Sequence, residues 1–149
     1  MEYESESELN AVLESFENCT VSRGDWGHPE HLIVAYFYCI EGDEAIAYWR
    51  MKSGILNLLD AFGIDKSKEM PFHETLTQFW IKVVFEFIKE RGRNEVLADC
   101  RELIRTFSKD YPLEFYSREL LFSDKARERF LPPEKPLPWS TLPVDVPYS

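Results

Sequence analysis

The stretch Leu32–Ile40, with the sequence LIVAYFYCI, carries no charged side chain. It follows Pro29, a residue suited to the first turn of a helix, and it precedes Gly42, where a helix can end. A helix with almost no polar face belongs in the middle of a fold, because an exposed side would place apolar atoms in water. We therefore predict a central helix that begins at Pro29 and runs to Gly42.

Four other segments repeat apolar residues at intervals of three and four, which is typical of helices with one buried face. Asp43 and Asn94 are suitable N-caps for two of these helices, and Ser123 is a suitable N-cap for a short helix over Asp124–Leu131. Gly54, inside one of the segments, should permit close helix packing. The four apolar stripes are Leu9, Val12, Leu13 and Phe16; Tyr48, Met51, Ile55, Leu59 and Phe62; Phe72, Leu76, Phe79, Trp80, Val83, Phe87 and Ile88; and Val96, Leu97, Cys100, Ile104 and Phe107.

The connections between these segments are short, and no convincing strand pattern competes with them. The sequence therefore predicts an all-α protein, a single-domain helical bundle of about five main helices with a short sixth helix. We expect residues 1–131 to form this helical domain. Six of the nine prolines lie in residues 132–149, which predicts an extended, proline-rich C-terminal tail.

The predicted tail is too apolar for a solvated linker, because it includes Leu137, Trp139 and Leu142. We expect it to dock on the helical domain. An alternative is that Pro133–Pro136 binds a proline-reading module of another protein, although so short a pattern often arises by chance.

The chain has 17 basic and 27 acidic residues, a formal net charge of -10. This charge argues against a nucleic acid or an anionic membrane surface as the main partner. The three cysteines are odd in number and widely spaced, which favours reduced thiols over a disulfide framework. With an acidic N-terminus and no apolar run of about 18 residues, the sequence predicts a cytoplasmic protein.

All three histidines lie in two short motifs, each at a predicted helix start, which is Pro29 in the first motif and Pro71 in the second. The first motif is Trp26–Leu32, WGHPEHL, and the second is Met70–Thr75, MPFHET. His28 and His31 are three residues apart, so both imidazoles should lie on one side of a first helical turn. His73 shares the apolar stripe of its helix and should face the core. We predict that the three rings meet in the folded protein.

Such a cluster could hold a metal ion. The candidate ligands are His28, His31 and His73, with a carboxylate from Glu30 or Glu74. Three imidazoles with an optional carboxylate suit one divalent transition metal, Zn, Fe, Mn or Ni, and leave a position open for water or a small-molecule substrate. Metal-activated water attack and metal-assisted oxidation would both fit this ligand set. The carboxylate that is not a ligand could instead accept a hydrogen bond from the second ring nitrogen of a ligating histidine and so fix the tautomer of that ring.

Other interpretations of the histidine motifs need no metal. The motifs could form an acid-base pocket that acts on a small molecule, or an anion site at the paired helix starts. In another class of function, the histidines are internal polar ties, and the protein is a non-catalytic interaction module whose surface or tail binds a protein partner. The chain has no glycine-rich phosphate loop, Gly-x-Ser-x-Gly elbow or Cys-x-x-Cys pair, so nucleotide hydrolysis is not expected.

Two patterns, Trp26-x-His28-x-x-His31-Leu32 and Phe72-His73-Glu74-Thr75-x-Thr77-x-x-Trp80, resemble the motifs of a family of small, uncharacterised helical proteins found mainly in bacteria. The second family motif usually begins with tyrosine, and Phe72 lacks that hydroxyl. The resemblance continues through residues 116–127 to the Pro-Leu-Pro near residue 137. It implies that the two histidine motifs act as a unit, but it implies neither a reaction nor a cofactor.

Overall fold

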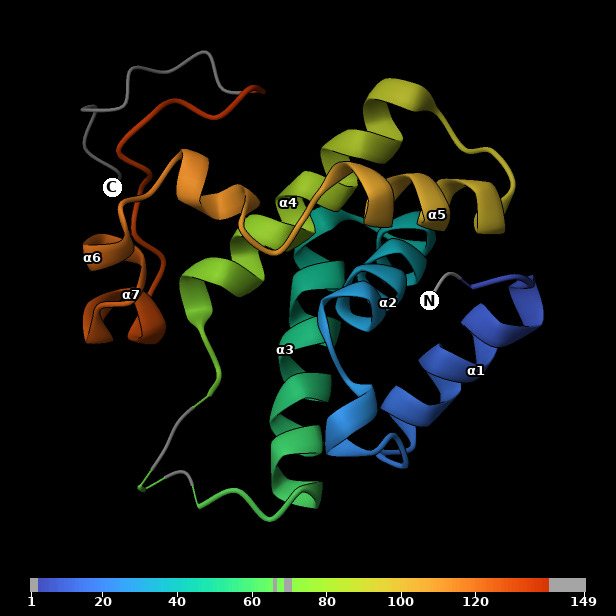
Figure 1. The fold of residues 1–149 in the computed structure, drawn as a ribbon, viewed down its shortest axis with the longest axis horizontal. Coiled ribbons are helices and arrows are strands. Elements are labelled where there is room, and N and C mark those ends of the chain that lie inside the picture. Colours follow the sequence, from blue (N-terminus) through green and yellow to red (C-terminus); the bar gives the residue numbers. More distant parts are fainter. Residues whose placement is uncertain (1–2, 66, 69–70, 140–149) are drawn as a thin grey trace.

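The computed structural model describes residues 3–65, 67–68 and 71–139 (Figure 1). Helices make up its regular structure, and none of the residues in these ranges is in a strand, which confirms the all-α prediction. Two short 3-10 turns, at Arg23–Asp25 and Tyr111–Glu114, lie between the helices. The helices are α1 (Glu6–Glu17), α2 (His28–Glu41), α3 (Glu44–Ala61), α4 (Glu74–Arg91), α5 (Val96–Thr106), α6 (Arg118–Leu121) and α7 (Asp124–Glu128).

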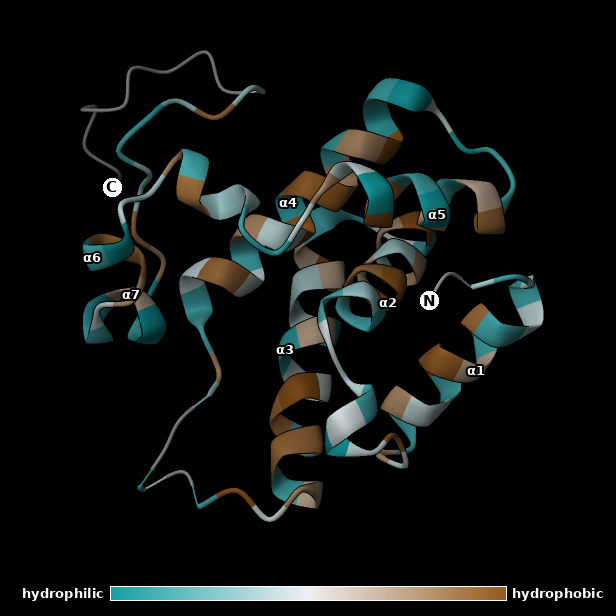
Figure 2. Cartoon of the chain, in the orientation of Figure 1, coloured by the Kyte–Doolittle hydropathy of each residue, from teal (hydrophilic) through white to brown (hydrophobic). Residues whose placement is uncertain are grey.

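Helix α2 occupies the centre of the bundle, as its apolar sequence predicts. It packs against α1, α3, α4 and α5, and residues 32–39 are all buried. The two tyrosines in this run still reach polar partners: Tyr36 donates to Asp99 at 2.6 Å, and Tyr38 donates to Glu17 at 2.7 Å. Helices α1 and α4 carry both hydrophobic and hydrophilic residues along their length, as Figure 2 shows.

Gly54 lets α1 approach α3, as expected. A Cβ atom at this position would lie 2.4 Å from the ring of Phe16, far inside van der Waals contact. The Phe16 ring is itself held by Trp26, on which it stacks with centroids 4.7 Å apart. Because Gly54 has no side chain, the Phe16 ring fits against α3 and can stack on Trp26, the first residue of the first histidine motif.

The N-caps are only partly those predicted. Asp43 accepts a hydrogen bond from the Ile46 N–H, and Ser123 caps α7, as expected. The cap of α5 is different: Glu95 occupies the N-cap position without a side-chain bond. The predicted cap, Asn94, instead donates its backbone N–H to Asp99, so the prediction for Asn94 was wrong.

The prediction of one helix over residues 124–131 was wrong at its end. Helix α7 ends at Glu128, and the additional short helix α6 precedes it. The hydroxyl of Thr75 on α4 donates to the carbonyls of Ala126 and Arg129, and it accepts the N–H of Leu131. Backbone groups that bond to α4 in this way are not available to continue a helix.

Helix α4 begins at Glu74 rather than at Pro71. His73 is the N-cap residue, with an extended backbone at φ -130° and ψ 106°. Its ring Nδ1 accepts the N–H of Leu76 at 3.1 Å, which replaces the side-chain oxygen that usually caps a helix. Within the second histidine motif, His73 is therefore the cap of α4 and does not belong to its first turn.

The first part of the predicted tail contacts the helical domain. The backbone N–H groups of Glu134 and Lys135 both donate to the carbonyl of Phe115, at 2.9 and 3.1 Å. Leu137 and Trp139 pack against the core. The rest of the predicted tail, residues 140–149, lies outside the described residues. Within the described ranges, every helix is too short or too polar to cross a membrane.

Candidate functional site

The two histidine motifs come together around one cavity of about 420 Å³. The first motif supplies one side of the cavity at the start of α2, and the second supplies another side at the start of α4. The C-terminal half of α3 closes the space between them. The lining residues are Arg23, Trp26, Gly27, His28, His31, Ile55, Leu59, Phe62, Pro71, Phe72, His73, Leu76, Thr77 and Trp80.

His28 is held at the end of α5. Its Nε2–H donates to the carbonyl of Phe107 at 2.8 Å, and its ring packs on Trp80 with centroids 4.7 Å apart. Burial lowers the pKa of His28 below its usual range, and the charge of Lys109 acts in the same direction. The Phe107 carbonyl and the charge of Glu30 oppose this shift without reversing it. His28 is therefore neutral at pH 7, with one ring nitrogen in a structural hydrogen bond.

Both ring nitrogens of His73 make hydrogen bonds. Nδ1 accepts from the Leu76 N–H, and Nε2 lies 2.6 Å from the carbonyl of Leu121, to which it must donate because a carbonyl cannot. These two bonds define the neutral tautomer with its proton on Nε2. Burial lowers the pKa of His73, and the charge of Arg127 lowers it further, whereas the bond to Leu121 acts against both. His73 joins the start of α4 to the end of α6.

His31 differs from the other two histidines, because no residue in the described part of the chain makes a hydrogen bond to its ring. The ring is partly buried and meets the edge of Trp26 with centroids 6.2 Å apart. Burial, and then the charge of His28, lower its pKa to about 4. His31 therefore presents a neutral imidazole to the cavity at pH 7, with a nitrogen that can donate and another that can accept.

The two carboxylates of the motifs do not line the cavity. Glu30 completes a capping box: one oxygen accepts the Gly27 N–H at 2.9 Å, and the other accepts the hydroxyl of Tyr3. This pattern ties the chain before α1 to the start of α2. Glu30 therefore helps to position His28 and His31 on the first turn of α2.

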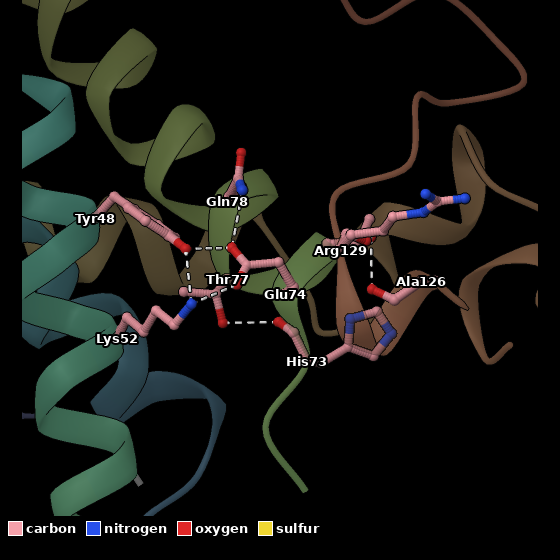
Figure 3. Close-up of polar contacts among 9 residues, drawn as sticks. Tyr48, Lys52, His73, Glu74, Thr77, Gln78, Ala126 and Arg129 are labelled. Atoms are coloured by element: carbon pink, nitrogen blue, oxygen red, sulfur yellow. Dashed lines mark hydrogen bonds and ion pairs between the residues drawn. The ribbon is translucent and has the colours of Figure 1, made fainter. Parts of the chain in front are cut away.

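Glu74 is directed toward α3, on the side of α4 away from Ala126 (Figure 3). It accepts hydrogen bonds from Lys52 at 2.9 Å, from Gln78 at 2.8 Å and from the hydroxyl of Tyr48. Burial alone would raise the pKa of Glu74, but the bonds from Gln78, Tyr48 and Lys52 outweigh it and hold the pKa below its usual range. Glu74 is an ionised residue of the α3–α4 interface.

These contacts bear on the metal hypothesis. Among the described residues, no group of three or more His, Cys, Asp or Glu side chains is arranged to hold a metal ion. Three of the six ring nitrogens of His28, His31 and His73 are in hydrogen bonds to the backbone. A metal bound to all three rings, with Glu30 or Glu74, would need His73 to break one of these bonds and a carboxylate to turn from its partners. The hypothesis stays a prediction.

Sequence reasoning missed two parts of the cavity lining, the wall on α3 and Arg23. Ile55, Leu59 and Phe62 belong to an apolar stripe whose spacing predicts burial, but a stripe does not distinguish a filled core from the wall of a cavity. Arg23 lies in a 3-10 turn before the first motif. The only sequence signal for Arg23 is that it lies a few residues before the first histidine motif.

No family model, curated protein or solved structure that was compared with the chain matches it. The resemblance to a bacterial family therefore stays a prediction, and the function has to be argued from the cavity.

Proposed function

We propose that the protein binds a small organic molecule in the cavity between the two histidine motifs, with His31 as the polar group that contacts it. The observation that carries this proposal is that all three histidines of the chain, from two segments far apart in sequence, line one cavity. Its volume of about 420 Å³ is in the range of small-molecule sites, roughly 300–1,000 Å³. Such sites have mostly apolar walls and a few polar groups that orient the ligand.

The hydrogen bonds of the three rings support a division of roles. His28 and His73 hold the ends of α2 and α4 in place through backbone carbonyls. Their rings therefore form fixed walls, and His31 offers its nitrogens to a ligand. A neutral imidazole can both donate and accept, so it can bind a hydroxyl, an amide or a carboxylate.

The pKa of His31 favours binding over proton transfer. A general acid or base works best when its pKa lies near the operating pH, whereas the pKa of His31 is about 4. The ring is therefore a weak base at pH 7 and a stable hydrogen-bonding group. We propose a binding protein, and an acid-base reaction at His31 would need a ligand that raises this pKa.

A test of the proposal blocks the cavity. Ile55→Trp would fill the cavity from α3, and Ile46→Trp would place the same side chain on the exposed face of the same helix. A fragment library screened by ligand-detected NMR should yield molecules that bind the wild-type protein and Ile46→Trp but not Ile55→Trp. The proposal fails if no fragment binds, or if every fragment binds Ile55→Trp as well as the wild-type protein.

The metal hypothesis makes a separate prediction. If His28, His31 and His73 bind a metal, protein purified without a polyhistidine tag should contain it, a triple His-to-Ala variant should lose it, and the wild-type protein should release it between pH 7.5 and pH 5. The backbone bonds of His28 and His73 lead us to expect equal, substoichiometric metal in the wild-type protein and the triple variant. One equivalent in the wild-type protein alone would replace our proposal by a metal site.

A second candidate function is an interaction module that binds another protein. Ile46 and Trp49, one turn apart on α3, are 52% and 59% exposed, which is unusual for two large apolar side chains on one face. Two of the three histidines are also structural ties, as this alternative expects. It predicts that Trp49→Ala abolishes partner binding and leaves fragment binding in the cavity unchanged.

A further inference from the structure

Helix α3 has a second apolar face, which points away from the core. Ile46 and Trp49 lie one turn apart on this face and are 52% and 59% exposed. This pair, the α3 patch, takes no part in the hydrophobic core, whereas the inner face of α3 packs on α2 and α4 and buries Ala47 and Met51. A helix of a bundle needs only one apolar face. Neighbouring exposed apolar side chains, a tryptophan above all, are typical of surfaces that bind another molecule.

The Trp49 ring is positioned by its neighbours on the protein. It meets the Tyr48 ring edge-on, with centroids 5.1 Å apart, and the Nζ atom of Lys52 lies 5.4 Å from its centroid. Lys52 is in turn fixed by an ion pair with Glu74 at 2.9 Å (Figure 3). Because the ring is already ordered, a partner that packs on Trp49 loses little free energy to the ordering of this side chain.

The turn before α3 places carboxylates beside Ile46. The Ile46 side chain rests on this turn, because a Cβ atom at Gly42 would lie 3.7 Å from it. Asp43 is the N-cap of α3 and accepts the Ile46 N–H at 2.8 Å. Since the turn has the sequence EGDE, the side chains of Glu41, Asp43 and Glu44 all lie at this end of the α3 patch.

The ion pairs of the turn leave an excess of negative charge. Asp43 makes no ion pair with any described residue. The two cations that pair with the other carboxylates are each shared with a second one: the pairs are Arg50 with Glu17 and Glu41, and Lys82 with Glu44 and Glu86. The start of a helix carries about half a positive charge, which Asp43 and Glu44 together outweigh. The patch therefore has an acidic border, in a protein whose formal net charge is -10.

We infer that the α3 patch binds a basic peptide segment of another protein, in which apolar side chains are flanked by lysine or arginine. The apolar side chains pack on Ile46 and Trp49, and the cations face the carboxylates of residues 41–44. An acidic surface attracts a cationic partner and repels a second copy of this chain or an anionic membrane.

This inference goes beyond the proposed function and names the partner chemistry of the second candidate function. The C-terminal half of α3 lines the cavity, whereas Ile46 and Trp49 lie nearer its start, so the two sites are separate.

The test uses three synthetic helical peptides with the same leucine face, whose flanking positions are all lysine, all glutamine or all glutamate. Binding to the full chain is followed by the indole N–H signals of the four tryptophans in NMR spectra, each assigned with a Trp→Phe variant. The lysine peptide should shift the signal of Trp49 and not those of Trp26 and Trp80 at the cavity. At low salt we expect it to bind roughly tenfold more tightly than the glutamine peptide, the size of two or three exposed ion pairs, and the glutamate peptide to bind most weakly. This advantage should shrink at about 0.5 M salt.

Asp43→Asn combined with Glu44→Gln removes two charges and keeps the cap of α3, because asparagine caps a helix about as well as aspartate. This double variant should bind the lysine peptide several-fold more weakly than the wild-type protein does and the glutamine peptide equally well. The matched control, Asp110→Asn with Glu114→Gln, removes two exposed carboxylates at the second 3-10 turn and should bind both peptides like the wild-type protein. Trp49→Ala should lose peptide binding and keep fragment binding in the cavity.

The inference is overturned if the glutamine peptide binds as tightly as the lysine peptide, if the two double variants bind the lysine peptide equally, or if no peptide binds. It is also overturned if sedimentation shows a dimer of the wild-type protein that Trp49→Ala abolishes, because the α3 patch would then bind a second copy of the chain. The proposed function stands in each of these cases, since the fragment screen tests the cavity separately. Failure of the fragment screen, in turn, leaves this inference intact.

Discussion

The hydroxyl of Thr75 should be one of the most stabilising polar groups in the protein. Thr75 is fully buried on the first turn of α4. Its Oγ1 donates to the carbonyls of Ala126, at 2.7 Å, and Arg129, at 2.9 Å, and it accepts the N–H of Leu131 at 3.1 Å. A hydroxyl has one hydrogen, so the two carbonyls share it. This one oxygen therefore connects α4 to α7 and to the start of the C-terminal segment.

Thr75→Val keeps the shape of the side chain and removes the hydroxyl. One shared donated bond and one accepted bond are lost, each worth about 1 kcal/mol, and backbone groups without a partner add about 1–3 kcal/mol. Because Arg129 is exposed and Leu131 is only partly buried, water can reach some of these groups. We expect the free energy of unfolding to fall by about 3 kcal/mol.

Urea unfolding followed by tryptophan fluorescence measures this change. Thr75→Ser is the matched control: it keeps the three contacts and loses one methyl group, at a cost of about 1 kcal/mol. Hydrogen exchange should also show that the Leu131 amide exchanges faster in Thr75→Val only. The reasoning is refuted if Thr75→Val is as stable as the wild-type protein, or if Thr75→Ser is destabilised as much as Thr75→Val.

Three other predictions follow from single contacts. The pKa of His31 is lowered from 6.5 to about 4, so the native state favours its neutral form, and its contribution to stability is complete above pH 6.5 and is lost as the pH falls toward 4. Between pH 7 and pH 5, urea unfolding should show a loss of stability that is about 1–2 kcal/mol larger in the wild-type protein than in His31→Gln, after allowance for the partial exposure of the ring. The lowered pKa values of His28 and His73 contribute to the loss in both proteins. An equal loss in the two proteins would contradict this. Glu74→Gln removes the ionised partner of Lys52 and should lower the free energy of unfolding by about 1–3 kcal/mol at pH 7. The affinity of the cavity for its ligand should stay unchanged. A loss of affinity would instead assign Glu74 to the binding site. Gly54→Ala should destabilise the protein by about 1 kcal/mol in thermal unfolding. Overpacking against Phe16 costs about 1–3 kcal/mol, and the gain in helix propensity offsets about 1 kcal/mol of this cost. A variant more stable than the wild-type protein would show that the Phe16 ring can move without cost.

The sequence predicts the centre of the fold well, because burial of α2 depends on a local pattern. Nine apolar or aromatic residues in a row, Leu32–Ile40, can be a helix only if other helices surround it. Gly54 was predictable for the same reason, since the lack of a side chain inside an amphipathic helix indicates close contact. The partner at that contact, Phe16, depends on the tertiary structure and could not be named.

Local sequence patterns do not predict the hydrogen bonds of the candidate site. His73 and Glu74 are neighbours in sequence, but α4 begins between them, and their side chains face opposite sides of the helix. The spacing of apolar residues locates a helix within a few residues, and a shift of the start from Pro71 to Glu74 turns His73 from a first-turn residue into a cap. The hydrogen bonds to Phe107 and Leu121 come from distant parts of the chain, so no local pattern predicts that two of the three histidines already have partners.

A crystal structure of the protein with the tightest-binding molecule of the fragment screen would examine the proposed function at atomic resolution. Our account predicts density for the molecule between the starts of α2 and α4, with a polar atom in hydrogen-bond contact with a ring nitrogen of His31 and its apolar part against Trp80. His28 and His73 should keep their bonds to Phe107 and Leu121. A molecule bound elsewhere on the surface, with the cavity holding only water, would contradict the account.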